Sequence, residues 1–107
     1  MRSPRRDGDR YEKYIRTTDP ETQIVRGSGS SAEKKGDLKK GNRYLIQAKR
    51  TNMASFTVKL SDLVKAEKEA MNLGRVPLFY IGFYNSDRVT DEWVMIPRWK
   101  LNSLLPE

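Results

Sequence analysis

Apolar positions spaced three to four residues apart predict two helices. The first covers residues 7–16, opens with an aspartate cap, and turns Tyr11, Tyr14 and Ile15 to one face. The second covers residues 61–74, with Ser61 as its cap and Gly74 as its end signal. The stretch between Thr17 and Glu21 contains a proline, which disfavours helix at the preceding residue and therefore separates the first helix from the first strand.

Short apolar runs between turn residues predict strands in the rest of the chain. The second and third strands form a hairpin whose turn falls at residues 40–42. The resulting order, αβββαββ, predicts a small α/β fold with a central mixed β-sheet flanked by helices, because a helical crossover joins strands of one sheet. The predicted strands are residues 22–26, 37–39, 43–50, 76–84 and 92–97.

Length and composition change this picture only slightly. With 107 residues the chain is expected to form one domain over residues 7–107, preceded by a basic flexible arm at residues 1–6. No apolar run approaches the roughly 20 residues of a membrane span, so we expect no membrane partner. No apolar segment follows the first charges, so we expect no secretory signal and a cytoplasmic location, which includes the host cytoplasm if the chain is phage-encoded.

Residue types that are missing limit the possible chemistry. The chain has no cysteine and no histidine, which excludes thiolate zinc sites and the usual general base. Any catalysis then depends on carboxylates, lysine, tyrosine, hydroxyls or an oxygen-ligated metal. The net charge of +7 favours polyanionic partners, and nucleic acid above all.

Three polar side chains suit phosphodiester hydrolysis. Gln47 and Lys49 stand two residues apart in an apolar strand and so share a face, and Asp37 approaches that face from the preceding strand. Asp37, the Gln47 amide oxygen and the Ala48 backbone carbonyl are hard oxygen ligands for Mg²⁺ or Mn²⁺. Lys49 can stabilise the transition state. Each residue also has an explanation without function. Asp37 could be a turn residue and Gln47 a polar residue on a strand edge, while Lys49 could belong with Arg50 to an exposed basic edge.

Gly36-Asp37, followed by Gln47-Ala48-Lys49 on a predicted strand, resembles the PD-(D/E)xK nuclease superfamily. The run from "GSGSS" to "YLIQAKRT" is most similar to the archaeal and phage-type Holliday-junction resolvases, and its Gln-x-Lys-Arg form is also similar to Mrr-type nucleases. The similarity extends over residues 9–83 and includes the order of the elements. It implies a single restriction-endonuclease-like domain.

The resemblance implies roles for further residues. Asp37 and the Gln47 position bind metal, Lys49 is the catalytic lysine, and Glu12 corresponds to the first-helix glutamate that completes such sites. Ser28 and Ser30 match a loop that contacts the scissile backbone, and the nearby basic residues Lys34, Lys35 and Arg50 suit phosphate contact.

Gln47 stands where the family usually has an acidic residue, which removes one negative charge from the metal site. Either Glu12 supplies that charge, or a carboxylate has moved to the second helix. Glu67 is the candidate there, because it shares a helical stripe with four apolar residues: Leu63, Val64, Ala70 and Met71. If neither supplies it, the protein is a weak metal binder and a DNA-binding remnant.

The sequence therefore predicts a metal-dependent DNA endonuclease of the Holliday-junction resolvase kind, active in DNA recombination on branched DNA. A resolvase cuts two strands in a related way, so the resemblance implies a homodimer. The alternatives are a noncatalytic nucleic-acid-binding protein and an Mrr-like nuclease of plain duplex. The dimer interface is predicted among apolar residues of the last strand and tail: Trp93, Met95, Trp99, Leu101, Leu104 and Leu105.

Overall fold

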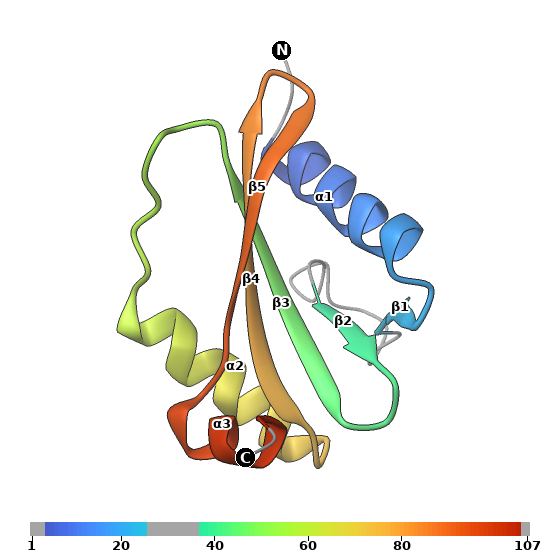
Figure 1. Cartoon of the computed structure of the whole chain (residues 1–107), viewed down its shortest axis with the longest axis vertical. Coiled ribbons are helices and arrows are strands. Elements are labelled where there is room, and N and C mark those ends of the chain that lie inside the picture. The colour runs from blue at the N-terminus through green and yellow to red at the C-terminus, as the bar shows by residue number, and fades with distance from the viewer. Residues whose placement is uncertain (1–3, 26–36, 106–107) are drawn as a thin grey trace.

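A computed structural model describes residues 4–25 and 37–105 of the chain, and side chains are described for residues 10–25 and 38–105. One five-stranded mixed sheet, in the order β1-β2-β3-β4-β5, forms its centre (Figure 1). The predicted α/β class and mixed sheet are confirmed, and the observed order αβββαββα adds a short final helix. The elements are α1 Pro4–Thr18, β1 Thr22–Ile24, β2 Asp37–Lys40, β3 Tyr44–Thr51, α2 Leu60–Asn72, β4 Val76–Asn85, β5 Arg88–Met95 and α3 Arg98–Leu104.

The strands pair antiparallel except for β3 and β4, which run parallel. Parallel neighbours need a long crossover, and here α2 provides it. The turn between β2 and β3 depends on Gly41, whose φ of +56° is a backbone conformation that glycine adopts readily. Arg75, which follows α2, donates to the Gly41 carbonyl at 2.9 Å and so ties the end of the crossover to this turn.

The predicted end of the second helix is confirmed, whereas its predicted cap is wrong. Gly74 has a φ of +68°, and the amides of Gly74 and Arg75 donate to the carbonyls of Met71 and Ala70 at 3.0 and 2.8 Å. These two bonds satisfy carbonyls that the last turn would otherwise leave open. At the other end Lys59 occupies the cap position without a side-chain hydrogen bond, so Ser61 lies inside the first turn.

The first helix and the last strand both begin earlier than predicted. α1 starts at Pro4 and therefore includes residues 4–6, which the sequence assigned to the arm. Residues 1–3 lie outside the described part. β5 starts at Arg88, four residues before the predicted strand, because the tight turn at Ser86–Asp87 lets pairing resume at once with Asn85. Its residues are nearly all exposed, so they carry no apolar alternation that sequence could detect.

The main core lies between α1 and one face of the sheet. Tyr11 and Ile15 of α1 pack with Leu38, Ile46 and Tyr84 from three strands. Burial raises the pKa of the Tyr11 hydroxyl above its ordinary value, and the Glu92 carboxylate, which accepts its hydrogen bond at 3.0 Å, raises it further. This bond links α1 to β5.

The turn after α1 is fixed to the sheet edge by charge. Lys40 of β2 pairs with Asp19 and, at 3.2 Å, with Glu21. The Lys40 hydrogen bond lowers the pKa of Asp19, and the same bond raises the pKa of Lys40. No helix in the described part of the chain is long and apolar enough to cross a membrane.

The contact between Tyr11 and Gly82 predicts a strict size limit at position 82. A Cβ atom there would lie 2.7 Å from Cε1 and Cζ of the Tyr11 ring, which is only 1% exposed and has no room to swing away. We expect Gly82→Ala to lower the free energy of unfolding by about 1–3 kcal/mol, measured by urea denaturation.

Gly74→Ala is the matched control for that measurement. Its Cβ would meet open space, so only the positive φ opposes it, at a cost of about 1 kcal/mol. An unfolding midpoint for Gly82→Ala equal to that of the wild type would contradict the tight seating of α1.

Candidate active site

The register between β2 and β3 brings two of the predicted site positions together. Asp37 is the direct partner of Gln47, at the end of the β2–β3 ladder in the described chain. Lys49 lies two residues further along β3 and therefore on the same face as Gln47. The predicted backbone arrangement of Asp37, Gln47 and Lys49 is thus present.

The face that carries Gln47 and Lys49 is the one covered by α2. The alternate β3 residues Ile46 and Ala48 pack toward α1 on the other side of the sheet. Gln47 donates from its amide nitrogen to Oε1 of Glu69 in α2, at 3.3 Å. This bond joins β3 to α2 at the position of Gln47. We call the surface around Asp37, Gln47, Lys49 and Glu69 the α2-face site.

Glu69 is a site residue that the sequence prediction missed. The buried residues of α2 are Ala66 and Ala70, so these two mark the side of the helix that meets the sheet. At about 100° per residue, Glu69 then lies on one flank of that side and Glu67 on the other. The flank of Glu69 faces β3, which explains its bond to Gln47.

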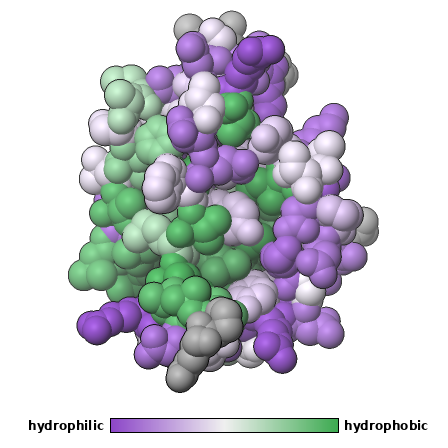
Figure 2. Space-filling view, viewed as in Figure 1, coloured by the Kyte–Doolittle hydropathy of each residue, from purple (hydrophilic) through white to green (hydrophobic). Residues whose placement is uncertain are grey.

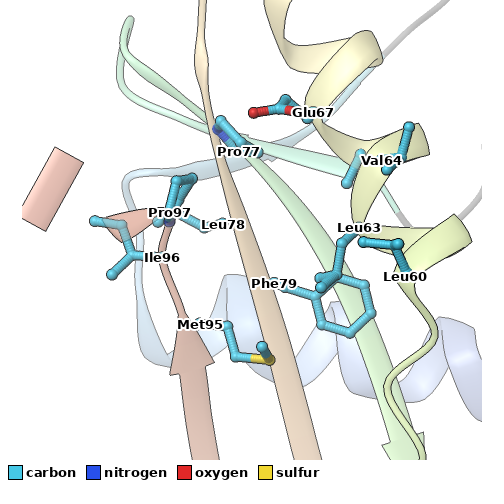
Figure 3. A pocket seen from close by; sticks show the side chains of 11 residues that line it. Leu60, Leu63, Val64, Glu67, Pro77, Leu78, Phe79, Met95, Ile96 and Pro97 are labelled. Carbon is cyan, nitrogen blue, oxygen red and sulfur yellow. The ribbon is translucent and has the colours of Figure 1, made fainter. Parts of the chain in front are cut away.

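Glu67 lies instead beside an apolar pocket of about 200 Å³ between α2, β4 and the end of β5 (Figure 3). Its neighbours there include Pro77, Phe79 and Met95. The helix carboxylate bonded to Gln47 is therefore Glu69, and the role of Glu67 as a metal ligand, which was inferred from its helical stripe, stays a prediction. Val64 and Met71 were assigned to that stripe, yet they are 38% and 67% exposed.

Glu12 reaches the sheet from the other side. Glu12 lies on α1 next to Tyr11, which packs on the face of the sheet opposite Gln47. Glu12 is only 8% exposed. A buried carboxylate needs compensating partners, so the position is strongly constrained. A role for Glu12 in metal binding stays a prediction.

The predicted DNA-contact residues are only partly described. Ser28, Ser30, Lys34 and Lys35 lie outside the described residues. Arg50 points to the α1 face, where its guanidinium carbon lies 3.6 Å from the centre of the Tyr84 ring and its Nη2 donates to Oδ1 of Asn52 at 2.7 Å. Burial raises the pKa of Tyr84, and the charge of Arg50 partly offsets that rise. Arg50 therefore does not share the face of Lys49.

The donors of the α2-face site are of the type that Mg²⁺ and Mn²⁺ prefer. The Gln47 amide oxygen, the Glu69 carboxylate and the backbone carbonyl of Ala48 are hard oxygen ligands, and Asp37 would add a second carboxylate. Among the side chains that the structure describes, no three histidine, cysteine, aspartate or glutamate residues form a metal-binding group, and the Asp37 side chain lies outside that set. These donor types suit Mg²⁺ and Mn²⁺. A complete set of metal ligands also requires the carboxylate of Asp37.

Comparison of the chain with models of protein families, with curated proteins and with solved structures finds no match.

The positions of Glu69 and Glu67 on opposite flanks of α2 predict which of the two glutamates binds a metal ion. We expect Glu69→Gln to weaken Mn²⁺ affinity about 10- to 100-fold, measured by titration calorimetry, because it removes a carboxylate next to the Gln47 amide. Glu67→Gln is the matched control and should leave the affinity unchanged. Equal effects of the two substitutions would contradict the assignment.

Proposed function

We propose that the protein is a metal-dependent DNA endonuclease that acts on branched DNA. The observation that carries this proposal is the β2–β3 register, which pairs Asp37 with Gln47 on the face that also holds Lys49. Glu69 supports it, because it supplies a carboxylate where the strand itself offers only the neutral amide of Gln47.

In this proposal each residue has a separate task. Asp37, Glu69 and the oxygens of Gln47 and Ala48 would hold Mg²⁺ or Mn²⁺. Such an ion would lower the pKa of a bound water molecule and neutralise charge on the phosphate. Lys49 would orient the water or donate to the phosphate oxygens as negative charge develops on them. The hydrogen bond from Gln47 to Glu69 would fix the amide so that its oxygen faces the site.

The net charge of +7 supports DNA as the substrate, since each phosphate contact releases counterions. The same charge suits a noncatalytic nucleic-acid-binding protein, which would need no intact α2-face site. A third candidate is an Mrr-like nuclease that cuts plain duplex.

The test compares wild type, Asp37→Asn and Lys49→Ala on a labelled four-way junction and a matched linear duplex. Reactions contain Mg²⁺, Mn²⁺ or EDTA. We expect paired nicks in the junction that need metal, and a loss of at least about 100-fold in rate for each variant. Lys68→Ala, an exposed lysine on α2, should cut like the wild type.

The outcomes of this assay separate the three candidates. Equal cutting of junction and duplex would favour the Mrr-like nuclease. Binding without cutting in any metal would favour the noncatalytic protein. In that case Asp37→Asn would retain or tighten binding, because it removes a carboxylate that faces phosphate.

We further propose that two copies pair through the apolar surface formed by the end of β5 and α3. Figure 2 shows hydrophobic surface over the left and lower part of the view, where α2 and α3 lie. Trp93 and Trp99 are 67% and 63% exposed, more than expected for indole rings of a monomer. β5 is also an edge strand, which leaves one side open to pairing.

We expect light scattering to give a dimer for the wild type and a monomer for Trp93→Ser/Trp99→Ser, because the double variant removes the two largest apolar anchors. Met53→Ser is the control, since Met53 is 70% exposed but lies in the connection between β3 and α2. A monomeric wild type at micromolar concentration would refute the dimer.

A further inference from the structure

A second charged surface lies on the α1 side of the sheet, away from the α2-face site. It is an open groove of about 580 Å³ between α1 and the β4–β5 hairpin. Four α1 residues on one stripe line its first wall, at spacings of three and four. The hairpin forms the second wall. The lining residues are Arg10, Lys13, Tyr14, Thr17, Tyr84, Asp87, Arg88 and Val89.

The described residues that line the groove carry a net positive charge. Arg10, Lys13 and Arg88 are exposed cations, and among the described lining residues Asp87 is the single acid. Arg10 Nη1 bonds to Asp87 Oδ1 at 2.9 Å, with side chains 41% and 63% exposed. A bridge this exposed contributes little to stability, so a phosphate can replace the carboxylate at Arg10 without a large cost.

The groove also offers aromatic surface. Tyr14 is 37% exposed, and its ring stacks on the buried Tyr11 with centroids 6.5 Å apart and planes 24° apart. Tyr84, which also lines the groove, meets Tyr11 edge-on with ring centroids 6.0 Å apart. Tyr11 therefore supports the Tyr14 ring from the protein side, while part of the Tyr14 ring is accessible to solvent.

Cations that follow a groove beside an open aromatic ring are the features by which proteins hold unpaired nucleic acid. We propose that this groove binds an unpaired DNA strand, with a base stacked on Tyr14 and phosphates against Lys13 and Arg88. Its volume suits a ligand of one or two nucleotides. The inference goes beyond the proposed function, because it requires neither metal nor the α2-face site.

Binding is measured by fluorescence anisotropy with a labelled oligo(dT) of about 12 nucleotides in EDTA, where no cleavage contributes. We expect Tyr14→Ala to weaken binding at least about fivefold through lost stacking, and Tyr14→Phe to retain it. Lys13→Glu and Arg88→Glu should each weaken binding and reduce the salt slope by about 0.7. Asp87→Asn should tighten binding, since it removes the competing carboxylate.

Two controls keep the test specific. Lys68→Glu makes the same charge change on an exposed residue of α2 and should have a smaller effect than Lys13→Glu. A duplex of equal length should bind more weakly, because its bases are already stacked. Circular dichroism checks that each variant is folded.

Unchanged affinity in Tyr14→Ala, or an equal loss in Lys68→Glu and Lys13→Glu, would overturn the proposal. Equal binding of duplex and single strand would overturn it as well. Lys49→Ala separates this inference from the proposed nuclease: it should abolish cutting and leave oligo(dT) binding intact.

Discussion

The contact between the Tyr11 ring and the backbone of Gly82 determines where α1 sits on the sheet. A side chain at position 82 would force the ring away, and the hydrogen bond from Tyr11 to Glu92 would be lost with it. With α1 held at this place, Ile15 reaches Ile46 and Leu38, and the main core closes. The stripe that lines the open groove then faces the hairpin. Both the core and the groove therefore depend on a glycine at position 82 of β4.

The two faces of the sheet are packed in different ways. The α1 face is closed by aromatic packing and carries Arg50 stacked on Tyr84. The α2 face is held by small residues, Ala66 and Ala70, which leave the flanks of the helix to Glu69 and Glu67. In the proposed function, chemistry takes place on the α2 face, while the α1 face offers a strand of DNA a second place to bind. An enzyme for branched DNA has to manage more than one strand, and two faces with separate surfaces suit that need.

The sequence predicts those parts of the fold whose local pattern agrees with the final burial. Alternation in "YLIQAKRT" predicts β3 and puts Gln47 and Lys49 on one face, and Gly74 marks the end of α2. Prediction fails where burial is decided by neighbours far along the chain. Alanines form the buried side of α2, and small side chains give a weaker apolar signal than Val64 and Met71, so the apolar pattern of the helix does not single out Glu69. The alanine pair at positions 66 and 70 would have narrowed the choice to its two flanking carboxylates, Glu67 and Glu69, and only the docked position of α2 separates them.

The parallel pairing of β3 with β4 has a consequence for the order in which the α2-face site assembles during folding. β2 and β3 form a hairpin of neighbouring residues, and hairpins form within microseconds. Glu69, in contrast, is 22 residues from Gln47 in sequence and arrives only when the crossover has closed and α2 has docked. Closing a longer loop costs more entropy and makes non-local pairing slower. We therefore expect Asp37, Gln47 and Lys49 to align before the carboxylate of Glu69 joins them.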